Sequence, residues 1–151
     1  MKKIWAVLSV GALVLAVGAI ALASGTAVTK PTRIHVIELP KTDVVIDTGE
    51  SGDTSGDLLT FHNKLLDTSR KDAGTDQGQC VRIDPGAGTW ECEWTNSLAD
   101  GQISVAGPFN DNHGTVLTVT GGTGAYKNAR GSMALRFRDN GNFDFIFSLI
   151  P

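Results

Sequence analysis

The sequence has little of what nucleic-acid binders and metalloproteins need. Its 13 lysine and arginine residues face 16 acidic residues, for a formal net charge of −3, so it has no basic excess for phosphate groups. The three histidines, His35, His62 and His113, are scattered, and the two cysteines have no further cysteine or histidine at ligand spacing. No histidine relay or serine nucleophile motif is visible. We therefore expect no nucleic-acid partner and no metal site.

Helical periodicity is also missing beyond residue 23, and the one long apolar run lies at the N-terminus. Lys2 and Lys3 precede an uncharged stretch from Ile4 to Leu22, and Ala21-Leu22-Ala23 is a small-x-small pattern typical of a cleavage site. We predict a signal peptide over residues 1–23 and a secreted protein. A retained anchor, and with it a membrane partner, is the alternative, because the run is close to the roughly 18 residues that span a bilayer.

The two cysteines, Cys80 and Cys92, flank a predicted hairpin turn. Pairing outward from this turn gives three opposed pairs: Asp84 with Gly88, Arg82 with Trp90, and Cys80 with Cys92. Cross-strand partners are close enough to bridge, and an exported protein meets an oxidising compartment. The sequence therefore predicts a Cys80–Cys92 disulfide, with two free cysteines as the alternative. Arg82 and Trp90 form either a stacked pair inside a cavity or an ordinary surface pair.

After a polar tether over residues 24–32, short strand-like segments recur to the end of the chain, each bounded by Gly, Asn, Asp or Pro. The eight segments are 33–39, 58–66, 78–83, 89–95, 102–106, 115–120, 131–138 and 143–150. Their number and spacing predict an all-β domain over residues 33–151, a single antiparallel eight-stranded β-barrel. The stretch from Asp47 to Asp57 has three glycines, four acidic residues and no apolar residue, and it predicts a flexible surface loop.

Several ordered motifs of this domain resemble the allene oxide cyclase and dirigent barrel family. GGTGAYKNARG over residues 121–131 is similar to the GGTGxYxxARG turn of that family. GDLLTFHNKLL over 56–66, GQCV over 78–81 and GQISVAGPF over 101–109 are similar to three further segments of plant allene oxide cyclases. The resemblance covers residues 33–149. It implies a closed barrel whose lumen binds a small apolar molecule without a cofactor.

The resemblance also implies roles for individual residues. Glu38 and Asn63 match the glutamate that steadies positive charge on the substrate and the asparagine that holds an oxygen-anchoring water. Phe109 stands where the cyclases have a tyrosine, and Cys80 matches a cavity cysteine. Arg130 matches the arginine of the dirigent turn. We therefore take Glu38 and Asn63 as catalytic candidates, and Arg82, Trp90, Phe109 and Arg130 as ligand-binding candidates.

Glu38 shares a strand face with Ile34 and Val36, so an inward face would bury its carboxylate among apolar groups and raise its pKa. A glutamate at the strand end that reaches solvent or pairs with an arginine is the alternative. The sequence leaves three functions open: a cofactor-free cyclase or isomerase, a dirigent-like binding and orienting protein, and a structural barrel with no ligand. The family resemblance also implies a dimer or trimer.

Overall fold

The computed structural model describes residues 32–150, so the predicted signal peptide lies outside the described residues. The strands are β1 (Thr32–Leu39), β2 (Val44–Ile46), β3 (Leu58–Asp67), β4 (Asp72–Asp84), β5 (Thr89–Leu98), β6 (Gly101–Asn110), β7 (Thr115–Gly122), β8 (Arg130–Phe137) and β9 (Phe143–Ile150). Among the described residues, the helical content is one short 3-10 turn, η1 (Gly124–Tyr126). Within the described part of the chain, no helix has the length and apolarity to cross a bilayer.

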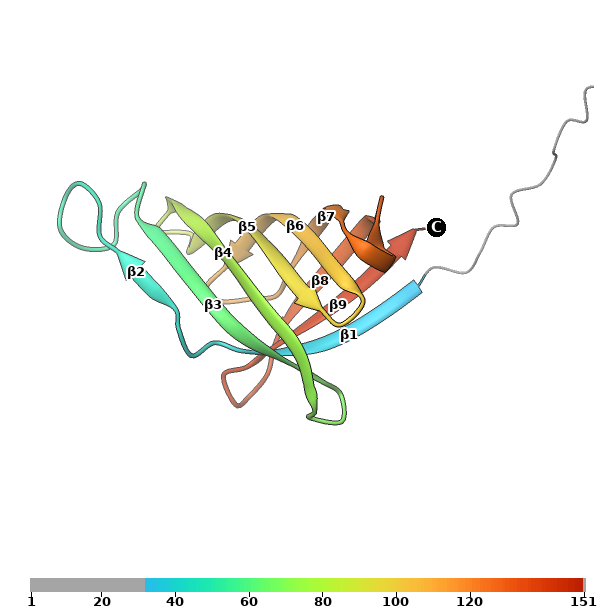
Figure 1. Cartoon of the computed structure of the whole chain (residues 1–151). Coiled ribbons are helices and arrows are strands. Elements are labelled where there is room, and N and C mark those ends of the chain that lie inside the picture. Colours follow the sequence, from blue (N-terminus) through green and yellow to red (C-terminus); the bar gives the residue numbers. More distant parts are fainter. Residues whose placement is uncertain (1–31, 151) are drawn as a thin grey trace, which may run out of the picture.

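The strands close into the predicted eight-stranded antiparallel barrel (Figure 1). They are hydrogen-bonded in the order β1-β9-β8-β7-β6-β5-β4-β3, and β1 returns to pair with β3. The short strand β2 is a ninth strand that pairs with the first residues of β3, from Leu58 to Thr60, while β1 pairs with its last residues, from Lys64 to Asp67. β1 and β2 therefore occupy one strand position, interrupted between Leu39 and Val44.

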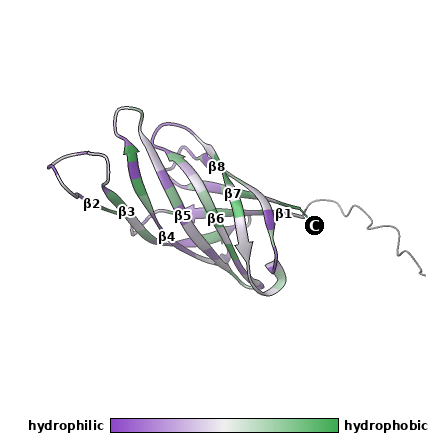
Figure 2. Cartoon of the chain, turned by 90° about the horizontal axis from the view of Figure 1, so that it is seen from above, coloured by the Kyte–Doolittle hydropathy of each residue, from purple (hydrophilic) through white to green (hydrophobic). Residues whose placement is uncertain are grey.

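The hydrophobic core lies inside the barrel, because side chains alternate between the inner and outer faces of each strand. In Figure 2, hydrophilic and hydrophobic residues alternate along the strands. On β9, Phe145, Phe147 and Leu149 point into the core, and on β8 Met133 and Leu135 do the same. Figure 1 shows that β2 projects at one end of the barrel, whereas the start of β1 and the end of β9 lie at the opposite end.

The hairpin of β4 and β5 has the predicted disulfide. Arg82 pairs with Trp90 and Cys80 with Cys92, and the two cysteines are bonded with their Cα atoms 4.0 Å apart. The predicted pairing of Asp84 with Gly88 was wrong, because a bulge after Arg82 sets Asp84 opposite Thr89. The bulge does not change the pairing of the residues further from the turn, because Arg82 still lies opposite Trp90 and Cys80 opposite Cys92.

Two further expectations need correction. β4 begins at Asp72, not Gly78, because the polar stretch before Gly78 pairs with both neighbouring strands. The loop from Asp47 to Asp57 is largely exposed as expected, but Asp57 is buried, and side-chain hydrogen bonds fix the loop to it. Asp57 accepts from the backbone N–H groups of Thr48 and Thr54, each at 2.8 Å, and these bonds hold the pKa of the Asp57 carboxyl below its usual value.

Candidate functional site

A cavity of about 90 Å³ lies inside the barrel, towards the end at which β2 projects. Its polar side chains are Glu38 and Asp43. The rest of its wall is apolar: Leu59, Phe61, Cys80, Cys92, Trp94, Phe109, Leu135, Phe143 and Phe145. An engineered cavity that binds benzene has a volume of about 150 Å³, so this lumen is smaller and its walls must move to admit a ligand of that size.

Glu38 points inward from the end of β1, as the alternation with Val36 predicts, and it is 5% exposed. Among the described ion pairs, none joins Glu38 to an arginine. Instead, its Oε1 accepts a 2.8 Å hydrogen bond from the Asn63 amide. Burial raises the pKa of the Glu38 carboxyl, the nearby Asp76 and Asp43 carboxylates raise it further against the Asn63 bond, and the result is about 9. Glu38 is therefore protonated at neutral pH.

Asp76 completes an acidic pair with Glu38. It is fully buried on β4 opposite Asn63, whose backbone N–H donates to it at 3.2 Å. Burial raises the pKa of Asp76 to about 7, although a hydrogen bond with the Glu38 side chain lowers it. Apart from the carboxyl group of Glu38, no group of the described residues donates to Asp76 Oδ2. Electrostatic repulsion makes it unfavourable for both carboxyl groups to be ionised at once, so the pair shares one proton between pH 7 and 9.

Asn63 positions this pair and fills the interruption between β1 and β2. Its Nδ2 group donates to Glu38 and, at 2.7 Å, to Asp43 Oδ1. Its Oδ1 accepts the backbone N–H groups of Lys41 and Thr42, at 2.9 and 3.0 Å, where Pro40 ends the regular pairing of β1. Asn63 thus has both amide hydrogens engaged by carboxylates and does not itself line the cavity.

Three phenylalanine rings cluster on the side of β6, β8 and β9, and two of them, Phe109 and Phe143, line the cavity. Phe137 and Phe143 meet edge to face with ring centroids 5.0 Å apart, and Phe109 lies 6.1 Å from each. Phe109 therefore lies in the cavity wall, at the position where the cyclases have a tyrosine. Phe137 is 40% exposed, so this ring cluster, Phe109–Phe137–Phe143, borders the solvent.

Arg82 and Trp90 are buried and stacked, with the guanidinium carbon 4.1 Å from the ring centroid. They do not line the cavity of Glu38. Arg82 binds Asp53 through two hydrogen bonds of 2.7 Å and also binds Asp111, to which the Trp90 indole N–H donates. Burial disfavours the charge of Arg82, but these carboxylates raise its pKa. The pair clamps the acidic loop onto the barrel.

Arg130 lies away from this cavity. It is exposed at the start of β8, where it pairs with Ile150 and borders a shallow hollow that also includes Thr32 and Leu149. This hollow is at the end of the barrel that holds the start of β1, opposite β2 (Figure 1). If Arg130 binds a ligand, as the sequence predicts, it must do so at a different site from that of Glu38.

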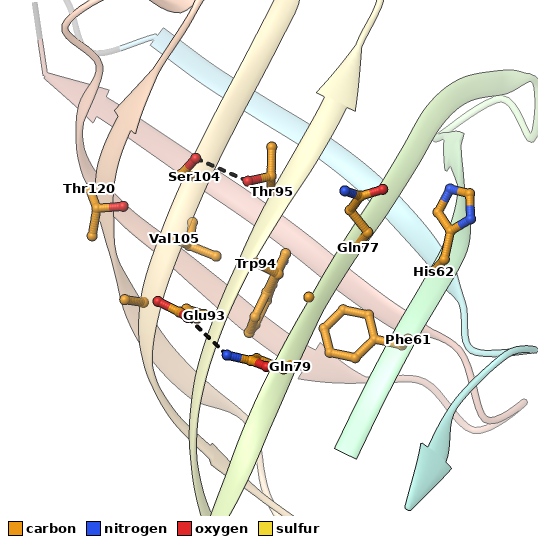
Figure 3. A pocket seen from close by; sticks show the side chains of 12 residues that line it. Phe61, His62, Gln77, Gln79, Glu93, Trp94, Thr95, Ser104, Val105 and Thr120 are labelled. Carbon is orange, nitrogen blue, oxygen red and sulfur yellow. Dashed lines mark hydrogen bonds between the residues drawn. The ribbon is translucent and has the colours of Figure 1, made fainter. Parts of the chain in front are cut away.

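A larger, open hollow of about 790 Å³ lies on the outer wall over β3 to β7. Figure 3 shows His62, Gln77, Gln79 and Glu93 along it, with hydrogen bonds from Gln79 to Glu93 and between Thr95 and Ser104. Its floor is Gly78, beneath which the Trp94 side chain packs. Because its polar side chains are exposed, this groove is a solvated surface and differs in chemistry from the lumen.

Sequence reasoning missed three residues of the lumen. Asp76 lies before the predicted strand 78–83, although it alternates with Gly78 and Cys80 on the inward face of β4. Asp43 follows Pro40 and Lys41 in the interruption of β1, where no periodicity signals a direction. Trp94 alternates with Cys92, which could have identified it, and its buried Nε1–H has no acceptor among the described residues.

Comparison with known proteins agrees with this architecture. The family model of the allene oxide cyclase barrel-like domain matches residues 36–142. The chain belongs to the allene oxide cyclase barrel-like family. Its Glu38 lumen is thus the lumen of an allene oxide cyclase-like barrel, and the resemblance of its glycine-rich turn to this family is confirmed.

Solved structures share the fold of this allene oxide cyclase-like chain at low identity. A pyocyanin demethylase superposes with a TM-score of 0.70 at 23% identity, covering 78% of this chain and 99% of that one. The exo-specific intermolecular Diels-Alderase AbnU gives 0.61 at 18%, covering 80% and 98%. The pterocarpan synthase dirigent protein GePTS1 gives 0.61 at 19%, covering 78% and 83%. These likenesses concern the fold, and the activities are those of the named proteins.

Proposed function

We propose that this protein binds a small, largely hydrocarbon molecule in the barrel lumen and that Glu38 transfers a proton to or from it in a cofactor-free isomerisation or cyclisation. The observation that carries the proposal is the position of the buried Glu38 carboxyl in the wall of a largely apolar cavity, beside Asp43 and backed by Asp76. A carboxyl group whose pKa lies near the working pH is suited to give up a proton and take it back.

The arrangement supports a return path for the proton. When Glu38 gives its proton to a substrate atom, the Asn63 amide still donates to the carboxylate that forms. Asp76 can then share the proton that Glu38 later regains, so that the pair ends the cycle as it began. Neither oxidant nor reductant is needed, because one C–H or O–H bond forms as another breaks. Such catalysis is a matter of orientation and electrostatics in a dry site.

Binding and orientation without turnover is the second candidate. It is favoured by Asn63, both of whose amide hydrogens are engaged by Glu38 and Asp43. Asn63 therefore has no donor left to hold the oxygen-anchoring water that the plant reaction uses. A dirigent-like protein needs only a shaped lumen, and five aromatic rings supply one here.

The test uses cyclohex-3-enone, a compact ketone that isomerises to the conjugated cyclohex-2-enone by proton transfer, followed by ultraviolet absorbance. We expect turnover that falls about 100-fold or more in Glu38→Gln, the range for loss of a general acid or base, with cyclohexanone affinity unchanged. Leu59→Trp, which fills the lumen, should abolish both binding and turnover. Binding without turnover would support the second candidate, and no binding would refute both.

A further inference from the structure

The two ends of the barrel differ in charge. Because neighbouring strands are antiparallel, one end holds the start of β1, the β3–β4 and β5–β6 hairpins and the turn before β8, and the other holds β2 and the remaining turns (Figure 1). The exposed lysine and arginine residues at the first end are Arg33, Arg70, Lys71, Lys127 and Arg130. We call this end of the barrel, with these five residues, the basic end.

Few acidic side chains oppose these cations at the basic end. Asp72 is ion-paired at 2.7 Å with Lys64, which is not one of the five. Asp67 accepts two backbone N–H groups of its own turn, at 2.8 and 2.9 Å. Outside the Lys64–Asp72 pair, the described acids of this end are Asp67 and Asp100. The basic end therefore has a positive excess, although the whole chain has a net charge of −3.

The opposite end is acidic. Its exposed acidic residues lie between β1 and β3 and in the turns after β4, β6 and β8: Asp43, Asp47, Glu50, Asp53, Asp84, Asp111 and Asp139. The cations described there are Lys41, Arg82, Arg136 and Arg138. Arg82 and Arg138 are already ion-paired with aspartates. An anionic surface would therefore attract one end of the barrel and repel the other.

The basic end also has apolar surface beside its cations. A hollow of about 640 Å³ there is lined by Lys127 and Arg130 and by apolar side chains that include Leu149 and Ile150. Ile150 is 53% exposed and lies opposite Arg130 in the β8–β9 ladder. Cations next to apolar groups suit the boundary of a bilayer, where lipid phosphates meet acyl chains.

The chain enters the barrel at the same end. Thr32 begins β1, and the apolar run from Ile4 to Leu22 precedes it by the nine residues 23–31. A segment of nine residues extends over about 32 Å at most. If the apolar run is a retained anchor, the alternative that the sequence leaves open, it holds the basic end close to the bilayer. The acidic end, towards which the Glu38 cavity lies, then faces the solution.

We propose that the basic end docks on the headgroups of an anionic phospholipid bilayer. The five cations would contact the lipid phosphates, and Ile150 and its hollow would contact the apolar boundary beneath them. The proposal is independent of the proposed function, because none of the five cations lines the Glu38 cavity. It concerns the surface of the barrel itself, and an anchor would only add to the binding.

Vesicle binding tests the proposal with the chain from Ser24 onward. The barrel, its core and its disulfide lie within residues 32–150, so this chain keeps the whole fold and lacks the apolar run, which would enter any bilayer. Co-sedimentation compares vesicles of phosphatidylcholine alone with vesicles of equal parts phosphatidylcholine and phosphatidylglycerol. At low ionic strength, we expect at least about tenfold tighter binding to the anionic vesicles. The difference should disappear at about 1 M salt, where the Debye length is about 3 Å.

Two double variants locate the docking face. Lys71→Gln combined with Lys127→Gln removes two exposed cations of the basic end. Binding to the anionic vesicles should weaken about 10- to 30-fold, because each basic side chain near such a surface strengthens binding about fivefold. The control is Lys41→Gln combined with Arg136→Gln, which removes the same net charge from exposed positions towards the acidic end. Its affinity should stay within about twofold of the wild type.

The other outcomes overturn the proposal. If both double variants weaken binding equally, the net charge of the protein is responsible and the basic end is not a docking face. If the Lys71→Gln, Lys127→Gln variant binds as the wild type does, the lipid contacts lie elsewhere. Equal binding to neutral and anionic vesicles, or binding to neither, would also show that the inference is wrong. None of these results affects the proposed function of the lumen.

Discussion

Asn63 shows how a side chain can shape a site without lining its cavity. Glu38 lines the cavity, whereas Asn63 lies behind the wall and joins Glu38, Asp43 and the backbone after Pro40. Asn63 is therefore a positioning residue. The catalytic candidate that touches the lumen is Glu38, and its chemistry depends on the proton that it shares with Asp76.

This shared proton predicts a pH dependence of stability. The pKa values of Glu38 and Asp76 are raised to about 9 and about 7 in the folded protein, from 4.5 and 3.8. The folded protein therefore holds more protons than the unfolded chain between about pH 4 and 9. The free energy of unfolding must fall as the pH rises through this window, and this stabilising contribution is fully present only below it.

The variant Glu38→Gln separates this effect from others. It keeps the acceptor for Asn63 and cannot ionise, so its Tm should fall less than that of the wild-type protein between pH 5 and pH 9. Thermal unfolding followed by circular dichroism checks this, with Glu93→Gln as a charge-matched control that should keep the wild-type slope. Parallel Tm curves for Glu38→Gln and the wild type would show that Glu38 does not bind a proton more tightly in the folded state.

At the scale of the elements, the β4–β5 hairpin builds most of one cavity wall. Its inward face carries Cys80, Cys92 and Trp94, and Gly78 stands opposite Trp94. A Cβ atom at Gly78 would lie 2.3 Å from the Trp94 Cβ and 2.3 Å from the Glu93 carbonyl oxygen. The glycine of the GQCV segment is thus explained by the close approach of its neighbouring strand.

Gly78→Ala should therefore destabilise the protein by roughly 1–3 kcal/mol, the usual range for overpacking, because the backbone of β5 must move. The matched control is Gly121→Ala on β7, where an added Cβ would have no heavy atom within 4 Å and the change should be within about 0.5 kcal/mol. Urea unfolding midpoints measure both. Equal effects of the two substitutions would contradict the packing argument.

The same hairpin shows what the sequence could reveal. A turn with Pro85 and period-two alternation sufficed for the pairing of Cys80 with Cys92, because such pairing is local. The inward position of Glu38 followed from alternation in the same way. Asp76 was missed because a polar run resembles a loop when only its composition is read. Buried polar residues break the hydrophobic pattern, and partners distant in the sequence, here Asn63 and Glu38, compensate for them.

At the scale of the whole molecule, the barrel depends on contacts between its two ends in sequence. β1 pairs with β9 and with β3, and Thr32 is opposite Leu149. Strand number could be predicted from the sequence, but this closure and the interruption shared by β1 and β2 could not, because nothing local in the chain encodes which distant strands meet.

Adjacent chain ends predict that the barrel tolerates circular permutation. A chain that joins Ile150 to Thr32 through a short glycine-rich linker and opens between Asn140 and Gly141, in the exposed hairpin of β8 and β9, keeps every strand intact. It should show the β-sheet circular dichroism spectrum and cooperative unfolding of the parent. Opening the chain between Trp94 and Thr95, inside β5, should prevent folding. Loss of cooperative unfolding in the first permutant would show that the barrel needs its natural chain order.

The disulfide makes the lumen deformable on one side only. Cys80 and Cys92 tie β4 to β5 covalently, so this side of the lumen cannot widen by separating its strands. Phe109 and Phe143 line another side of the cavity and pack against Phe137, and these rings need only rotate. New ligand sizes would therefore be selected through substitutions in these three rings, while the strands joined by the cystine keep their register. The cystine-linked wall of the lumen is therefore rigid, and the wall with the phenylalanine rings is the one that can adapt to a ligand.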